Sequence, residues 1–226
     1  MLLLVGLIEA TRWEVWRRHW HGYHAVLRNR FPWNKGILVG KRPLQPKNVW
    51  SIRVRLEMSG AIRELALFNL AIDSKLRACD LVRLRVEDLW SGSSIRDRAT
   101  IIQKKTKRPV QFEVTEQTKS ALVAWLPFVR RNGGSYLFPS RWKTSHHLST
   151  RQYARIVHRW VKSIGLDASA YGTHSMRRTK AAQIYKKTGN LRAVQILLGH
   201  TKLESTVRYL GVEVDDALRI AEQIEL

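Results

Sequence analysis

The feature that most constrains this chain is a run of basic and aromatic side chains at helical spacing, between residues 171 and 210. His174 and Arg177 are three residues apart, His200 follows a glycine at a helix boundary, and Tyr209 comes nine residues later. Residues i and i+3 share one face of a helix, so the first two side chains can point at one target. A guanidinium binds an oxyanion through a planar fork of donors, and an imidazole can donate to it or accept a proton. The stretch therefore predicts three helices that together form a phosphate-binding site.

Tyr209 is the candidate nucleophile of this site. A phenol has a pKa of about 10, so a tyrosine that attacks covalently needs cations around it. Each of the four residues, taken alone, would also fit a basic helix with a core histidine and a core tyrosine. Their combination at these spacings favours a reaction site.

A family resemblance follows from these motifs. H-x-x-R, then L-G-H, then a tyrosine nine residues on resembles the second signature box of the tyrosine recombinases, the phage integrase family. The family's other signature, L-R-x-x-[DE]-L, is matched upstream by KLRACDL, with Arg77 and Asp80 in the corresponding places. The resemblance runs from about residue 47 to the end. It implies a mainly α-helical catalytic domain with a small antiparallel β-hairpin, an α+β fold.

The resemblance also implies a role for each residue of the site. Arg77 and Arg177 would hold the non-bridging oxygens of a phosphodiester, where negative charge develops during attack. His174 would orient or deprotonate the Tyr209 hydroxyl, and His200 would donate to the phosphate. The full implied catalytic set is Arg77, Lys105, His174, Arg177, His200 and Tyr209.

The clearest β pattern is a hairpin with strands at residues 99–103 and 110–114. Its tip carries four cations, which would suit a tip that enters a groove or one that only keeps an edge strand soluble. In the family this hairpin carries a catalytic lysine, which would protonate the departing 5′ oxygen. The matching residue is Lys105. Because Lys107 stands where a glycine is common, Lys104 and Lys107 remain alternatives.

Helical periodicity accounts for most of the remaining chain. Residues 47–58 predict one helix, and a second helix starts near Ala61, buries one apolar side and ends near Asp73-Ser74. A third short helix begins after Arg77 and includes Leu81 and Leu84. Two longer helices follow, one ending at Asn132-Gly133 and one that begins at a Ser149/Gln152 capping box and ends at Gly165.

The charge balance predicts a polyanionic partner. The chain has 226 residues, with 40 Lys+Arg against 18 Asp+Glu, which gives a formal net charge of +22. The apolar run at residues 1–10 is too short to span a bilayer and contains Glu9, so double-stranded DNA is preferred and no membrane association is expected. A single cysteine, Cys79, excludes an internal disulfide and fits the reducing cytoplasm.

The chain is expected to have two parts. Residues 1–45 form an N-terminal basic, Trp-rich extension and linker, in which Trp13, Trp16 and Trp20 fall on one face of a predicted helix. Residues 46–226 form the integrase-like catalytic domain. Most family members carry a separate DNA-binding domain at the front, for which 45 residues are too few. The chain therefore resembles the short, catalytic-domain-only members, or it is a fragment of a longer gene product.

The tail, residues 211–226, is acidic whereas the rest of the chain is basic. Val214, Leu218 and Ala221 fall on one stripe and predict a short amphipathic helix with too little apolar surface for a core of its own. It could fold back on its own domain. In the family such a tail docks on the next protomer, so the resemblance implies self-association into a synaptic tetramer on DNA.

The implied function is that of a site-specific recombinase or integrase that cleaves and rejoins DNA through a covalent 3′-phosphotyrosyl intermediate. No cofactor, ATP or metal is expected, because the phosphotyrosine keeps the bond energy and the chain has no D-x-D cluster near the basic boxes. Two alternatives are DNA relaxation of the type IB topoisomerase kind and a catalytically silent DNA-binding regulator.

Overall fold

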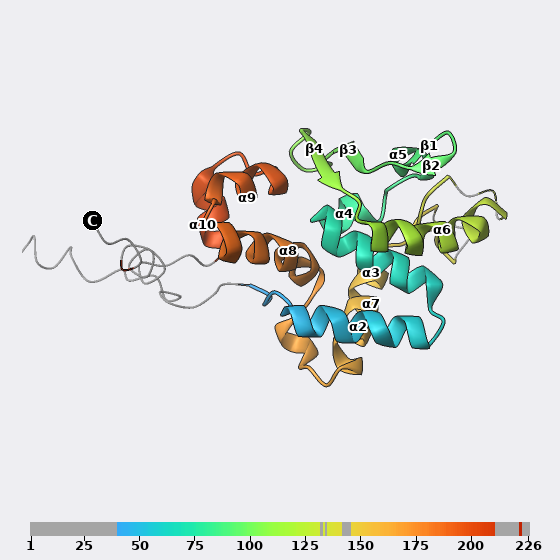
Figure 1. Cartoon of the computed structure of the whole chain (residues 1–226), viewed down its shortest axis with the longest axis horizontal. Coiled ribbons are helices and arrows are strands. Elements are labelled where there is room, and N and C mark those ends of the chain that lie inside the picture. Colours follow the sequence, from blue (N-terminus) through green and yellow to red (C-terminus); the bar gives the residue numbers. More distant parts are fainter. Residues whose placement is uncertain (1–39, 132, 134, 142–145, 211–221, 223–226) are drawn as a thin grey trace, which may run out of the picture. The chain divides into compact units, whose positions relative to one another are not determined.

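The computed structural model describes residues 40–131, 133, 135–141, 146–210 and 222. The helices and strands of this part of the chain are labelled in Figure 1. The helix predicted around Trp13 and the helix predicted in the tail lie outside the described residues. No described helix is both long and apolar enough to cross a membrane.

Helix α3 (Ile62–Ser74) is the centre of the packing, and it contacts α2 (Pro46–Met58), α6 (Glu116–Arg131) and α8 (Thr173–Thr188). The sequence pattern predicted one buried stripe on this helix. The structure instead buries every residue from 66 to 74, because several helices cover its second half. The end of α3 therefore lies in the core, and Arg77 comes three residues after it.

Helix α7 (Thr150–Ser163) confirms the predicted cap, since the hydroxyl of Ser149 accepts the backbone N–H of residue 152 at 3.1 Å. Its Trp160 packs edge-on against Phe68 of α3, with ring centroids 5.2 Å apart. The indole N–H of Trp160 donates to the Glu64 carboxylate at 2.8 Å, so the buried donor is satisfied. A 3-10 helix, η1 (Ala168–Ala170), then leads into α8.

The predicted hairpin is confirmed as β3 (Arg98–Ile102) paired antiparallel with β4 (Pro109–Glu113), each shifted by one residue from its expected range. Ala99 lies opposite Phe112 and Ile101 opposite Val110. Ala99, Val110 and Phe112 are buried, which is the period of two expected for a strand with one covered face.

One helix prediction was wrong. Helix α4 (Ala78–Leu81) ends before Leu84, whose carbonyl accepts the backbone N–H of Leu137 at 2.8 Å. This long-range pairing takes Leu84 out of the helix, and a separate short helix, α5 (Val86–Leu89), follows. A small hairpin, β1 (Trp90–Ser91) with β2 (Ser94–Ile95), was not predicted, since two-residue strands have no readable periodicity.

Residues 171–210 form three helices, as predicted: α8, α9 (Leu191–Leu198) and α10 (Leu203–Leu210). Gly189 ends α8 and Gly199 ends α9, each in the left-handed conformation that glycine adopts without strain. These two turns bring α9 against α8 and α10 against both. The segment before α2 is tied to the same region, because the N–H of Leu44 donates to the hydroxyl of Thr179 at 3.0 Å.

Candidate active site

Arg77 lies at the N-cap of α4, where the backbone is extended. Its Nη1 donates to the side-chain oxygen of Gln103, which is fully buried and also accepts from the Thr106 hydroxyl at 2.8 Å. The amide nitrogen of Gln103 donates to the carbonyl of Leu198 at 3.3 Å. Gln103 thus connects Arg77, the hairpin turn and the end of α9. No sequence motif singled it out.

Arg177 projects from α8 and is only 2% exposed. Its Nη2 donates to the carbonyl of Leu198 at 2.6 Å, and its Nη1 donates to the carbonyl of Lys75 at 2.5 Å. Burial lowers the pKa of Arg177 to about 10, and the charge of Arg77 acts in the same direction. The guanidinium therefore stays charged at pH 7, and its position is fixed by backbone acceptors from two other segments.

His200 comes directly after the glycine that ends α9. Its Nε2 lies 3.5 Å from Nη2 of Arg177, and its Nδ1 lies 3.1 Å from the hydroxyl of Thr206. Burial lowers the pKa of His200 to about 4, with further lowering by Arg177 and Arg77. The imidazole is therefore neutral at pH 7 and carries one proton that it can donate.

Tyr209, on α10, faces the same cluster. Its ring packs edge-on against His200, with centroids 5.4 Å apart, and the Cζ atoms of Arg178 and Arg177 lie 4.6 and 6.0 Å from the ring centroid. Burial raises the pKa of Tyr209, and the two arginines oppose that rise. The phenol is protonated at neutral pH, so a nucleophilic attack by this oxygen would require a proton acceptor.

His174 lies in the first turn of α8. Burial lowers its pKa, as do the charges of Arg177, Arg178 and Arg77, which favours a neutral ring that can accept a proton. Tyr209 contacts the backbone of His174, because its phenol hydroxyl donates to the His174 carbonyl oxygen at 3.5 Å. A contact between the imidazole and the phenol stays a prediction.

Lys105 is exposed in the turn between β3 and β4. Within the described part of the chain, no hydrogen bond or ion pair joins it to the other five predicted residues. Its neighbour Lys104 is anchored, because its backbone N–H donates to a carboxylate oxygen of Asp80 at 2.9 Å. Lys107 has a φ of 55°, a conformation that glycine usually occupies. The structure thus brings five of the six predicted residues together, and the three lysines remain alternatives.

Arg178 was not predicted as a site residue from the sequence. It is 6% exposed, packs against the Tyr209 ring, and donates from Nη1 to the carbonyl of Lys41 at 2.9 Å. A Cβ atom on Gly40 would lie 3.2 Å from the Arg178 guanidinium, so the backbone there passes close to the side chain. The only feature of the sequence that pointed to Arg178 was its position next to Arg177. That position argued against a shared site, because consecutive residues on a helix do not lie on the same face.

The described residues contain no group of three or more His, Cys, Asp or Glu side chains that could hold a metal ion. Cys79, next to Asp80, is a free thiol whose pKa is raised by partial burial. The charges that converge around Tyr209 are those of the arginines.

The chain also matches known proteins in sequence. A sequence model of the phage integrase family matches residues 43–215. The probable integrase/recombinase YoeC of Bacillus subtilis (strain 168) is 28% identical over 162 residues, which cover 72% of this chain and 84% of YoeC. Tyrosine recombinase XerC of Neisseria gonorrhoeae (strain ATCC 700825 / FA 1090) is 30% identical over 165 residues, which cover 72% of this chain and 52% of XerC.

Among solved structures, the site-specific recombinase XerH bound to its difH substrate in a pre-cleavage complex has a TM-score of 0.61 at 21% identity. The match covers 82% of this chain and 55% of XerH. This likeness confirms the mainly helical fold with a small antiparallel sheet. The chain spans about half the length of XerC and XerH.

Proposed function

The chain belongs to the phage integrase family, and from that membership we propose that it is a site-specific DNA recombinase. It cleaves and rejoins strands of double-stranded DNA through a covalent 3′-phosphotyrosyl intermediate. The observation that carries this proposal is the placement of Tyr209 against His200, Arg177 and Arg178 in one partly buried basic site. A tyrosine in such surroundings can attack a phosphodiester whose charge the arginines stabilise.

The bond that forms joins the phenol oxygen of Tyr209 to phosphorus, and the bond that breaks joins phosphorus to the 5′ oxygen of the next nucleotide. Arg77 and Arg177 hold the non-bridging oxygens. His174 takes the phenol proton, directly or through water, and Lys105 returns a proton to the departing 5′ oxygen.

His200 donates to the phosphate. A guanidinium only donates, so the 3.5 Å contact from Nη2 of Arg177 makes Nε2 an acceptor and places the proton of the neutral ring on Nδ1, which donates to the Thr206 hydroxyl. Donation to the phosphate uses the other tautomer, in which Nε2 carries the proton and the Thr206 hydroxyl donates to Nδ1.

The second half of the reaction reverses the first. The freed 5′ hydroxyl of a partner strand attacks phosphorus and displaces Tyr209, so no ATP is consumed. Arginine charges supply the stabilisation that a metal would otherwise provide, and we propose that strand transfer is metal-independent. The relatives that the chain matches are recombinases and integrases, which supports strand exchange over DNA relaxation or silent DNA binding.

We further propose that the enzyme acts on DNA in the cytoplasm and assembles there into a synaptic tetramer. Residues 1–45 would be a basic extension and 46–226 the catalytic domain, with the acidic tail docking on a neighbouring copy. The charge contrast between the tail and the basic body supports docking of this kind.

The test is Tyr209→Phe. With a nicked suicide duplex that traps the cleaved product, the parent should form a covalent protein–DNA adduct, also in EDTA, and the variant should bind the duplex and form none. Tyr185→Phe is the matched control, because Tyr185 packs in the same small apolar cluster as Tyr209. It should leave adduct formation intact. An adduct formed by the Tyr209→Phe variant would contradict the assignment of the nucleophile, and activity lost in EDTA and restored by magnesium would contradict metal independence.

A further inference from the structure

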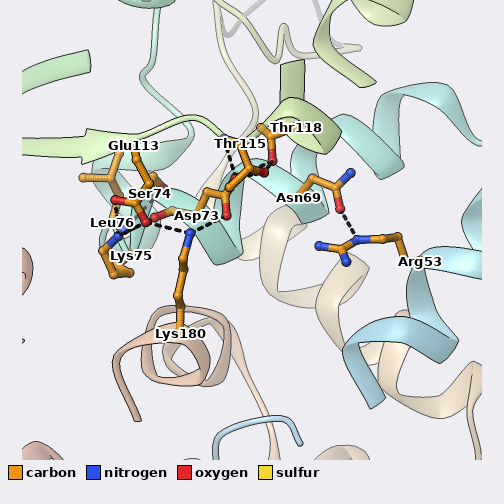
Figure 2. Close-up of polar contacts among 10 residues, drawn as sticks. All are labelled: Arg53, Asn69, Asp73, Ser74, Lys75, Leu76, Glu113, Thr115, Thr118 and Lys180. Atoms are coloured by element: carbon orange, nitrogen blue, oxygen red, sulfur yellow. Dashed lines mark hydrogen bonds and ion pairs between the residues drawn. The ribbon is translucent and has the colours of Figure 1, made fainter. Parts of the chain in front are cut away.

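Four charged side chains form a cluster of ion pairs next to segments that carry the candidate active site, and Figure 2 shows the contacts within this cluster. It consists of Asp73 at the end of α3, Lys75 just after it, Glu113 on β4 and Lys180 on α8. Lys180 donates to Asp73 at 2.7 Å and pairs with Glu113 at 2.6 Å, while Lys75 donates to both oxygens of Glu113 at 2.9 Å. Two cations and two anions thus neutralise one another in a cluster that buries Asp73 and Lys75 and leaves Glu113 and Lys180 partly exposed.

Lys75 is unusual in both its backbone and its side chain. Its φ of 54° is left-handed, a conformation that costs a side-chain-bearing residue energy and that glycine adopts freely. Its side chain is fully buried, and Nζ also donates to the carbonyl of Asp73 at 2.6 Å. Burial lowers the pKa of Lys75, and Glu113 opposes that effect. Since burial and the backbone both disfavour a lysine here, its contacts with Glu113 and Asp73 must hold it in place.

The same turn presents an acceptor to the active site. The carbonyl of Lys75 accepts from Nη1 of Arg177 at 2.5 Å, and Arg77 follows two residues later. Lys180 lies three residues after Arg177 on α8, so the cluster also fixes the helix that carries this arginine. Asp73 is in turn held by the hydroxyls of Thr115 and Thr118, each at 2.6 Å (Figure 2).

We propose that Lys75 is a positioning residue for Arg177, and this inference rests on the proposed recombinase function. Its buried ammonium fixes the left-handed turn by linking the end of α3 to Glu113 on β4. The turn then holds the Lys75 carbonyl where it orients the Arg177 guanidinium toward the scissile phosphate. The other interpretation is that the cluster only stabilises the fold. Its loss should then change the cleavage rate no more than a destabilising substitution elsewhere in the core does.

Lys75→Gly separates these interpretations. Glycine keeps the left-handed turn without strain, so the variant removes the ammonium and leaves the backbone free to adopt its present shape. We expect the single-turnover cleavage rate at saturating suicide substrate to fall by about 10- to 100-fold, the range that a small misplacement of a catalytic group can produce. DNA affinity should be unchanged. Glu113→Gln removes the ionic partner from the other side, and it should give a similar loss if Lys75→Gly does not fold.

Two controls distinguish positioning from stability. Val129→Ala truncates a fully buried core residue on α6, away from this cluster, and should lower the melting temperature while leaving the cleavage rate unchanged. In an Arg177→Ala background, Lys75→Gly should cause no further loss of cleavage, because its effect passes through that arginine.

Parental cleavage by Lys75→Gly or Glu113→Gln would overturn the inference, as would losses that multiply independently in the double variant. If the parent itself forms no covalent adduct, the proposed function fails rather than the role of Lys75.

Discussion

His200 illustrates how the surroundings of one side chain set its chemistry. The imidazole lies between Arg177 and the Thr206 hydroxyl, and it is also subject to the charge of Arg77. Burial among cations disfavours a second proton, so the ring remains a neutral donor at the pH where the enzyme would work. A histidine of ordinary pKa would be partly protonated there and would add a third charge beside two arginines.

The pH dependence of stability follows from this shift. The pKa of His200 is about 4 in the folded protein against 6.5 ordinarily, so the unfolded chain binds the proton more readily. Stability should therefore fall as the pH drops from 6.5 toward 4, and His200→Asn should reduce that fall by about 1 kcal/mol after allowance for solvent screening. Denaturant unfolding at pH 7 and pH 5 measures the effect. His146→Asn, at an exposed histidine, is the control that should change nothing, and an equal pH slope in the His200 variant and the parent would contradict the shift.

The site residues that the structure brings together were predicted from local spacing in the sequence. This is possible because a three-residue helical spacing and a glycine at the end of a helix are both visible within a few consecutive residues. The H-x-x-R pair is on α8, and Gly199 places His200 as the L-G-H motif implied. Gln103 and Lys75 could not be found in this way. Their contacts to Leu198 and Arg177 join segments about a hundred residues apart, and neither residue type is usual for its setting.

The β3–β4 hairpin shows how the elements of the site constrain one another. A Cβ atom on Gly199 would lie 2.5 Å from a methyl carbon of Val110 and 3.0 Å from the amide nitrogen of Gln103. The backbone at the end of α9 therefore packs directly against side chains of the hairpin, with no space for a side chain at residue 199. Asp80 on α4 anchors the start of the hairpin tip through the N–H of Lys104. The tip is therefore fixed at its base, while Lys105 extends into solvent and is free to meet DNA.

The hairpin lysines can be distinguished by their effect on the leaving group. If Lys105 protonates the 5′ oxygen, Lys105→Ala should cleave slowly on a normal substrate and recover when that oxygen is replaced by sulfur, a better leaving group that needs no acid. Cleavage rates on both substrates provide the measurement. Lys104→Ala and Lys107→Ala are the matched variants, and they should show no such sulfur-specific recovery. Recovery in one of them instead would move the general acid to that lysine.

Element prediction succeeded where periodicity was long and failed where pairing was non-local. Helices α2, α3, α6 and α7 and the β3–β4 hairpin were expected within a few residues of their bounds. Leu84 was assigned to a helix because it continued an apolar stripe, yet its carbonyl pairs with Leu137 across the fold. The burial of α3 on all sides was also unpredictable, since the sequence shows which residues are apolar and not how many neighbours cover a helix.

The charge of the whole chain gives the last prediction. The formal net charge is +22, and the ion-pair cluster around Lys75 is neutral within itself, so the excess positive charge is carried by other side chains. A protein that neutralises several phosphates releases their counterions, and its observed affinity falls by about 10³- to 10⁵-fold between roughly 50 and 200 mM salt if it makes about 6 to 10 such contacts.

We therefore expect a steep linear fall of log affinity with log salt, measured by fluorescence anisotropy on a duplex at several salt concentrations. Tyr209→Phe should give the same slope, because removal of one hydroxyl changes no phosphate contact of a cation. Arg77→Ala should reduce the slope by about one contact, if Arg77 holds one phosphate as proposed. A nearly flat dependence for the parent would mean that phosphate contacts do not provide its binding energy. The net charge of +22 would then need an explanation other than DNA binding.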